Sequence, residues 1–257
     1  MRTLELEYMM EHELRQSIYS HFPLDWKEDS ISHDLAIRLR RRFRRTTLVG
    51  TRFPIELDWE FYKLHGKAET QHGDIGLLFR QRLADGSVIE GAGFLEAKIR
   101  SRDSTKFCQV RREQNRRILS RSRLTLLLLY DYNAVSVLDS SLVPDADYEF
   151  FAHRWSNHGI THARVTHGAV LPLAVAAAIK RYDDTLYRFC YSLSHQFVHR
   201  YFQLHDLDFS SRAIKAVKGF PATVGSPSIL MVVRSAPVGR ELPDPFRPNG
   251  DLYAGLE

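Results

Sequence analysis

Three ionisable residues, Asp74, Glu96 and Lys98, stand in two short apolar segments of the chain. Acidic residues are depleted in β-strands, and a carboxylate there is costly to desolvate unless a cation or a hydrogen-bond donor meets it. Two carboxylates about 4 Å apart repel each other by about 4 kcal/mol at an effective dielectric constant of about 20. A hard divalent cation such as Mg²⁺ turns that repulsion into attraction. These residue types therefore predict a site for metal-assisted hydrolysis. The alternative is a turn acid at Asp74 and an exposed ion pair between Glu96 and Lys98 on a solvated face.

Two strands joined by a turn would position these residues. Side chains alternate across a strand, so the apolar rows of residues 75–79 and 95–99 each occupy one face. If both rows line one core, the three charged residues lie together on the opposite face. A two-residue loop at Asp85-Gly86 would break this agreement, because a slip of one residue flips every side chain. We therefore expect an odd-length loop around residues 83–87, or a bulge near residues 91–93.

The elements on either side of this hairpin follow from periodicity. Residues 30–45 predict a helix, with Ser30 or Ser32 as its N-cap and an apolar stripe at helical spacing. Residues 55–64 alternate apolar and acidic residues, as a strand does. Residues 106–120 predict a second helix, and the continuous apolar run 124–132 predicts a strand buried on both faces.

The charged residues and this order of elements resemble the PD-(D/E)XK nuclease superfamily, which has the restriction-endonuclease-like fold. Gly73 stands where the family name has proline. The resemblance covers about residues 30–135. It implies an α/β fold with an α-β-β-β-α-β core, in which a mixed central sheet is flanked by helices, followed by a C-terminal elaboration.

The resemblance also implies roles for individual residues. Asp74 and Glu96 would be ligands of Mg²⁺ or Mn²⁺, together with the backbone carbonyl of Ala97. Lys98 would orient the attacking water and offset developing negative charge. Related nucleases often carry a catalytic glutamine on the following helix, and the candidates here are Gln109, which is nearer the catalytic end, and Gln114. For both glutamines, an ordinary surface or capping role is an equal alternative.

An additional acid often comes from the first helix of this family or from its neighbourhood. The sequence offers several candidates and does not choose among them, since a solvated acidic face explains each equally well. The candidates are Asp34, Glu56, Asp58 and Glu69.

Charge gives a second indication. The chain has 36 Lys and Arg against 31 Asp and Glu, a formal net charge of +5. Residues 30–123 hold 21 of the basic and 11 of the acidic residues, so the basic excess lies on the same stretch as the candidate site. A polyanionic partner is expected, although arginine-rich helices also serve as soluble faces or subunit contacts. The residues expected to contact nucleic acid are Arg38, Arg41, Arg42, Arg45, Arg100, Arg112 and Arg116.

The length allows one large domain or two small ones. Because no linker precedes the region 140–235, and by the resemblance, we expect one nuclease-like domain over residues 1–235, with the elaboration at 140–235 and a loop-like or mobile proline-rich tail at 236–257. Within the elaboration we expect a strand and then a helix in 167–180, a helix over 183–205 and a buried strand at 228–234. Two cysteines make no disulfide framework, which favours a cytoplasmic location. No segment has the length and apolarity of a membrane span. A homodimer or a larger effector complex would suit cleavage of both strands of a duplex.

The sequence thus predicts a Mg²⁺-dependent phosphodiesterase that cleaves DNA, in a prokaryotic defence or restriction system by analogy. The alternatives are a catalytically inactive or accessory nucleic-acid-binding subunit of the same fold, and a member that cleaves RNA. Among twelve histidines, His195 and His199 have the spacing of two metal ligands on a helix. They lack the glutamate of an HExxH motif, so a zinc site is disfavoured.

Overall fold

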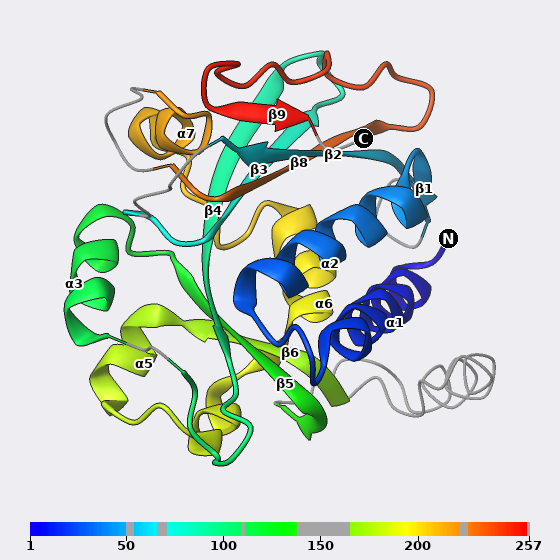
Figure 1. The fold of residues 1–257 in the computed structure, drawn as a ribbon. Coiled ribbons are helices and arrows are strands. Elements are labelled where there is room, and N and C mark those ends of the chain that lie inside the picture. Colours follow the sequence, from blue (N-terminus) through cyan, green and yellow to red (C-terminus); the bar gives the residue numbers. More distant parts are fainter. Residues whose placement is uncertain (50–53, 66–70, 109–110, 138–164, 221–225, 256–257) are drawn as a thin grey trace.

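One mixed β-sheet with helices on both faces runs through the protein (Figure 1). The computed structural model describes residues 1–49, 54–65, 71–108, 111–137, 165–220 and 226–255. The strands are β1 (Thr46–Leu48), β2 (Ile55–Leu64), β3 (Ile75–Arg82), β4 (Val88–Ile99), β5 (Leu126–Ser136), β6 (Val165–Pro172), β7 (Tyr191–Ser192), β8 (Ile229–Pro237) and β9 (Tyr253–Gly255). The α-helices are α1 (Thr3–His21), α2 (Glu28–Phe43), α3 (Arg112–Arg121), α5 (Leu173–Ile179), α6 (Leu193–His195) and α7 (Ser211–Val217). Shorter helical turns are η2 (Asp184–Phe189), η3 (Gln196–Arg200) and η4 (Tyr201–Gln203).

The strands lie in the order β1-β2-β8-β3-β4-β5-β6-β7, and β9 pairs with β2. The α/β class and the mixed sheet are therefore as expected. Along the chain, α2, β2, β3, β4, α3 and β5 follow the predicted order of elements. In space, however, β8 lies between β2 and β3, antiparallel to the first and parallel to the second. The sequence predicts a buried strand at residues 228–234, which is β8, but its central position in the sheet was not predicted.

The β3–β4 hairpin has the odd-length loop that the face argument requires. Its register runs without interruption from Ile75 opposite Leu95 to Arg82 opposite Val88. The amide of Leu83 donates to the carbonyl of Ser87, which leaves three residues in the loop. The last of these, Gly86, has a φ of +89°, as the left-handed position of a three-residue hairpin loop demands. Asp74 and Glu96 consequently stand opposite each other, one step beyond the first pair.

The larger core lies between the sheet and the helices α1, α2 and α6 (Figure 1). The predicted apolar rows all face it: alternate residues of β2, β3 and β4 are buried in this one cluster. The stripe of α2, formed by Ile31, Leu35, Leu39 and Phe43, packs on the same side. In β5, Leu128 joins this core, whereas Leu127 and Leu129 face the other side, so the strand is buried on both faces as expected.

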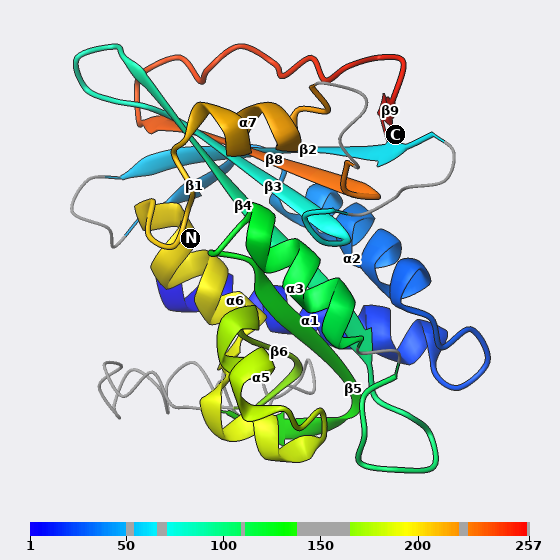
Figure 2. The same ribbon diagram turned by 90° about the vertical axis from the view of Figure 1, so that its left-hand side faces the viewer.

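Two smaller cores occupy the opposite face, which Figure 2 presents to the viewer. One packs β5 and β6 against α3, α5 and η2. The other packs β3, β4 and β8 against α7, and it includes Ala92 and Phe94 of β4. Continuing along that row, the next residues of β4 are Glu96 and Lys98. The two charged residues therefore begin where one apolar core ends, beside the β5 residues that face the other core.

Several predicted boundaries are wrong. The helix expected over residues 30–45 is α2. It begins at Glu28, and its N-cap is Lys27, not Ser30 or Ser32. Ser32 is instead buried within the helix, where its hydroxyl hydrogen-bonds that of Tyr130. The helix expected over residues 106–120 is α3, which begins at Arg112, while Lys106 and Phe107 form isolated β-bridges instead.

The stretch 183–205 is not one helix. Tyr191 and Ser192 pair with β6 and interrupt it, and the helical remainder contains the π-helical turn η3. The predicted strand and helix within 167–180 are confirmed as β6 and α5.

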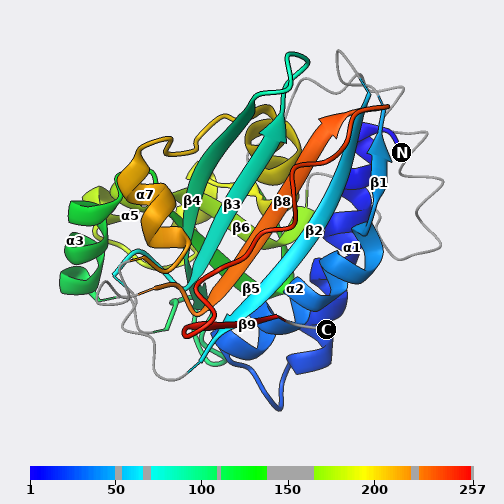
Figure 3. The ribbon, with the colours of Figure 1, turned by 90° about the horizontal axis from the view of Figure 1, so that it is seen from above.

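The proline-rich C-terminal segment leaves the end of β8, runs over one face of the sheet and ends at β9 (Figure 3). Its extended backbone agrees with the loop-like prediction, but the segment is packed against the fold: Phe246 and Tyr253 are buried in the core beside α7. Its end forms β9, which pairs with β2. Among the described residues, no helix combines the length and apolarity needed to cross a membrane.

Candidate active site

The hairpin brings Asp74, Glu96 and Lys98 together, as the sequence predicts. The Lys98 Nζ atom lies 2.7 Å from Oε1 of Glu96 and 3.8 Å from Oδ2 of Asp74. Glu96 is completely buried, and the side chain of Lys98 is 4% exposed. The predicted alternative of an ion pair on a solvated face is therefore wrong, since both partners are removed from water.

The backbone around Asp74 fixes its carboxylate. Oδ2 accepts a hydrogen bond of 2.9 Å from the amide of Ala97. The Asp74 carbonyl accepts from the hydroxyl of Ser228, which ties the start of β3 to the chain preceding β8. The preceding residue, Gly73, has a φ of +122°, and a Cβ there would lie 2.7 Å from the carbonyl oxygen of Leu95. Only glycine permits this close approach, which explains why proline is not tolerated at this position.

A fourth residue, Glu28, completes the cluster. Its Oε2 atom lies 3.3 Å from Lys98 Nζ, and it comes from the first turn of α2. We call Glu28, Asp74, Glu96 and Lys98 the Lys98 cluster. Sequence reasoning missed Glu28 because the helix was expected to begin two residues later. The available signal was its position beside Asp29 before an apolar helical stripe, since acids favour the first turn of a helix.

Gln114 supplies the glutamine of the site. Its Nε2 atom donates a hydrogen bond of 2.6 Å to Oε1 of Glu96, from the first turns of α3. The sequence favoured Gln109 for this role, and Gln109 lies outside the described residues. The contact of Gln114 removes the alternative of an ordinary surface glutamine for that residue.

The Lys98 cluster holds three carboxylates and one ammonium group. Burial raises the pKa of Glu96 to about 7, and the neighbouring Asp74 charge adds to the effect. Burial likewise raises the pKa of Glu28 to about 7 and raises that of Asp74. Burial alone would lower the pKa of Lys98, but the three carboxylates outweigh it and raise that pKa. The Lys98 cluster therefore has more carboxylate groups than its single ammonium group can neutralise.

The donor atoms fit a divalent cation. Oε2 of Glu96 is buried and has no hydrogen-bond partner in the described structure. An unsatisfied carboxylate oxygen is costly, and a cation would satisfy it. The carbonyl of Ala97 lies in the same place, 2.6 Å from Lys98 Nζ. Carboxylate and carbonyl oxygens are the ligands that Mg²⁺ and Mn²⁺ prefer.

An open cleft of about 450 Å³ gives access to the cluster. Its lining includes Glu28, Asp74 and Lys98, together with Arg111 and Gln114 from the region of α3. A substrate oxygen can therefore reach Asp74 and Lys98 from solvent, while Glu96 stays buried beside them.

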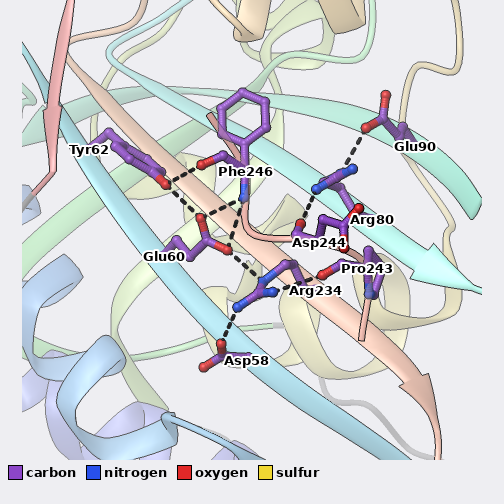
Figure 4. A network of polar contacts seen from close by, with 9 residues as sticks. All are labelled: Asp58, Glu60, Tyr62, Arg80, Glu90, Arg234, Pro243, Asp244 and Phe246. Atoms are coloured by element: carbon purple, nitrogen blue, oxygen red, sulfur yellow. Dashed lines mark hydrogen bonds and ion pairs between the residues drawn. The ribbon is translucent and has the colours of Figure 1, made fainter. Parts of the chain in front are cut away.

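The additional acids proposed on β2 do not reach this site. Asp58 and Glu60 pair with Arg234 of β8, each at 2.5 Å (Figure 4). Arg234 is level with Arg80 of β3, six residues along the strand from Asp74, a separation of roughly 20 Å. Glu56 is farther still in the same direction.

Of the two remaining acids, Asp34 is not at the site either. Asp34 pairs with Arg38 at 2.7 Å, about one and a half turns along α2 from Glu28. Glu69 lies outside the described residues. Strand and helix periodicity predicts the face on which an acid lies, but not its position along the element. The predictions for Asp34, Glu56 and Asp58 are wrong in that position.

The predicted nucleic-acid contacts divide into three groups. Arg38 and Arg100 are engaged in ion pairs, Arg100 with Asp131 at 2.8 Å, so neither is free for phosphate. The arginines at the end of α2 are exposed but lie roughly 20 Å along the helix from Glu28. Those of α3 are exposed and begin at the cleft. In the predicted set, Arg41, Arg42 and Arg45 belong to the second group, and Arg112 and Arg116 belong to the third.

Comparison with known proteins adds no relative. No family model, no curated protein and no solved structure matches the chain. The function is therefore argued from the Lys98 cluster and its surroundings alone.

Proposed function

We propose that this protein is a metal-dependent nuclease of the restriction-endonuclease-like type, acting on DNA. One observation carries the proposal: two carboxylates face each other across a β-hairpin, a buried lysine lies within 4 Å of both, and one carboxylate oxygen has no partner among the residues that the structure describes. Burying such a group of charges costs free energy unless a bound cation neutralises the carboxylates. The same residue types and spacing carry the resemblance to PD-(D/E)XK nucleases.

Phosphodiester hydrolysis assigns a task to each residue. Asp74, Glu96 and the Ala97 carbonyl would hold Mg²⁺ or Mn²⁺, which supplies Lewis-acid polarisation and acidifies a nearby water. Gln114 orients the Glu96 carboxylate through its hydrogen bond. Lys98 remains protonated because the carboxylates raise its pKa. It therefore acts as a fixed cation beside the developing negative charge, and not as a general base.

Glu28 is the residue placed to accept a proton. Its pKa is raised to about 7 by burial, close to the pH at which such a group can both take and release a proton. It lines the open cleft beside Asp74, where an attacking water would enter. We assign it the role of additional acid that the resemblance leaves to the first helix.

The exposed arginines of α3 suit a polyanionic substrate. Arg111 lines the catalytic cleft, and the helix leads from there to Arg121. Arg121 lines a second pocket with Arg212 and Lys215 of α7. This basic surface favours a nucleic acid over a small phosphate ester, because it extends away from the cleft and can contact further phosphates of a polymer. Phosphate contacts do not read sequence, so base specificity is not assigned.

The chain also departs from the resemblance at one place. The strand β8 separates β2 from β3, whereas the family core has three consecutive antiparallel strands. The hairpin that carries the candidate site is unaffected, because β3 and β4 remain adjacent. A restriction-endonuclease-like core with an added central strand is thus part of the proposal. A role in prokaryotic defence or restriction follows by analogy.

Cleavage of supercoiled plasmid in Mg²⁺ or Mn²⁺ tests the proposal. We expect metal-dependent nicking or linearisation by the wild type, abolished by EDTA and lost in Asp74→Asn and Lys98→Ala. Asp58→Asn and Lys218→Ala are matched controls, because they change an acid and a lysine that form ion pairs away from the cleft. Both controls should retain cleavage.

A parallel panel of labelled DNA and RNA identifies the substrate. Cutting of RNA alone would make the protein a ribonuclease with the same site. Binding of nucleic acid without any metal-dependent cutting would replace the proposal with the accessory, non-catalytic role.

A further inference from the structure

A second group of metal-ligating side chains lies on the other face of the sheet. It consists of Glu7 from α1, His195 at the end of α6 and His199 in η3. One ligand atom from each residue lies within 4.8 Å of the others. We call these three residues the Glu7 cluster. The two histidines have the spacing of metal ligands in the sequence, whereas the third residue, Glu7, comes from the N-terminal part of the chain.

The geometry is close to that of a tetrahedral metal site. Nε2 of His199 lies 2.9 Å from Oε2 of Glu7, and Nδ1 of His195 lies 3.8 Å from Oε1. Ligands about 2.1 Å from a tetrahedral Zn²⁺ are about 3.4 Å from one another, which falls between these two distances. The imidazole rings stack with centroids 4.7 Å apart, and each presents a ring nitrogen to the Glu7 carboxylate.

Burial distinguishes this cluster from a surface network. The side chain of Glu7 is 3% exposed and that of His195 is 13% exposed, whereas that of His199 is 28% exposed. Nδ1 of His195 is buried and accepts or donates no hydrogen bond within the described ranges of the chain. The ion pairs of Glu7 within the described residues are with these two histidines. The neighbouring Arg200 is engaged with Asp206 at 2.7 Å.

The donor set indicates the class of ion. Two imidazoles and one carboxylate suit Zn²⁺ and related transition metals, whereas the all-oxygen donors of the Lys98 cluster suit Mg²⁺ or Mn²⁺. Three protein ligands leave a fourth position for water, on the side where His199 is exposed. An ion here would join α1 to η3, which meet across the larger core.

We propose that Glu7, His195 and His199 bind one transition metal ion of the Zn²⁺ class, which fastens α1 to the segment 193–203. The inference does not depend on the nuclease proposal, because it concerns different residues and a different ion. Since a metal that binds only the folded protein stabilises it by mass action, the site is expected to raise the melting temperature.

Zinc titration of the metal-stripped full-length chain tests this site. The Asp74→Asn background removes a ligand of the Lys98 cluster, so zinc bound there does not confuse the result. We expect this variant to bind one Zn²⁺ per chain in competition with a chromophoric chelator and to melt at a higher temperature with zinc. Co²⁺ in place of Zn²⁺ should give visible d–d absorption that reports nitrogen and oxygen ligands.

Removal of a ligand provides the second arm. His199→Asn and Glu7→Gln, each in the same background, should weaken zinc binding at least about 100-fold, the upper range for loss of mere supporting contacts. His205→Asn changes an exposed histidine just after η4 and should bind as the background does. Absence of zinc binding by the background protein would overturn the proposal. Undiminished binding by His199→Asn and Glu7→Gln, with native circular dichroism, would overturn it equally.

Discussion

Two clusters of charged side chains on the same sheet differ in how their charges are balanced. The Lys98 cluster has three carboxylates for one ammonium group, and one of its buried oxygens finds no partner in the described part of the chain. A second cluster, which we call the Arg234 cluster, comprises Asp58, Glu60, Arg80, Glu90, Lys218 and Arg234 (Figure 4 shows all but Lys218). It has three acids for three bases, and backbone groups of the C-terminal segment satisfy further bonds.

The pKa values express the same difference. Burial would raise the pKa of Glu90, but Lys218 and Arg80 lower it. Burial raises the pKa of Glu96 to about 7, and Lys98 does not compensate. A cluster with balanced charges stabilises the fold. In an unbalanced cluster beside a cleft, buried and uncompensated charge costs free energy, which a bound ligand can offset. The imbalance, and not the presence of buried charge, is the reason for proposing a function for the Lys98 cluster.

The largest expected effect is on cleavage. Glu96→Gln removes a ligand charge from the Lys98 cluster while keeping its shape, so the rate in Mg²⁺ should fall at least about 10³-fold, or about 4 kcal/mol. Initial rates of plasmid nicking measure this. The isosteric change Glu90→Gln in the Arg234 cluster should leave the rate within about threefold. Equal losses in the two variants would end the distinction between the clusters.

The next effect is on the pH dependence of stability without metal. The folded pKa values of Glu28 and Glu96 are raised from 4.5 to about 7, so the folded protein binds protons more tightly than the unfolded chain. The unfolding free energy should therefore fall as pH rises from about 5 to 8, by roughly 3 kcal/mol for each of these carboxyls taken alone. Urea denaturation in EDTA measures it.

Two controls isolate this pH effect. The double variant Glu28→Gln/Glu96→Gln should lose the corresponding part of the slope, because it no longer carries the titrating carboxyls. Saturating Mg²⁺ should flatten the wild-type slope, since the ion replaces the protons. A wild-type slope identical to that of the double variant would show that these carboxyls are not strained.

Substitution in the Arg234 cluster should lower the stability of the protein and leave cleavage unchanged. Arg234→Met leaves Asp58 and Glu60 without their shared partner, and a loss of about 2 kcal/mol in unfolding free energy is expected because all three side chains are only partly buried. Denaturation midpoints measure it. The cleavage rate per folded molecule should remain near that of the wild type, and a collapse of that rate in a protein that is still folded would link the two clusters.

The smallest effect concerns support of the site. Gln114→Leu removes the hydrogen bond that orients Glu96, so cleavage should slow about 10-fold and require more Mg²⁺. Gln203→Leu, at an exposed position of η4, is the matched control and should change neither quantity. A shift in the Mg²⁺ requirement separates positioning from a general loss of stability, which a Mg²⁺ titration reads directly.

Local rules predicted the part of the site that lies within one hairpin. Alternation along β3 and β4 fixed the shared face of Asp74 and Glu96, and agreement of the two faces required an odd-length loop or a bulge, of which the structure has the loop. These features depend on neighbours within about 25 residues in the sequence, where strand parity leaves one consistent solution.

Features that depend on distant segments were not predictable. An apolar run such as residues 229–237 shows that it is buried, but not between which strands it inserts. Glu28 was missed because a two-residue error at a helix start changes which side chain reaches the site. The Glu7 cluster joins residues nearly 190 positions apart, and the two histidines alone gave no sign of their third partner.

Anomalous diffraction from crystals soaked in Mn²⁺ tests the central claim most directly. The account predicts a peak coordinated by Asp74, Glu96 and the carbonyl of Ala97, with Lys98 beside it. The peak should vanish in Asp74→Asn and persist in Asp58→Asn. A fully soaked crystal with no peak at the Lys98 cluster, or with manganese only at Glu7 and its histidines, would contradict the proposed catalytic metal site.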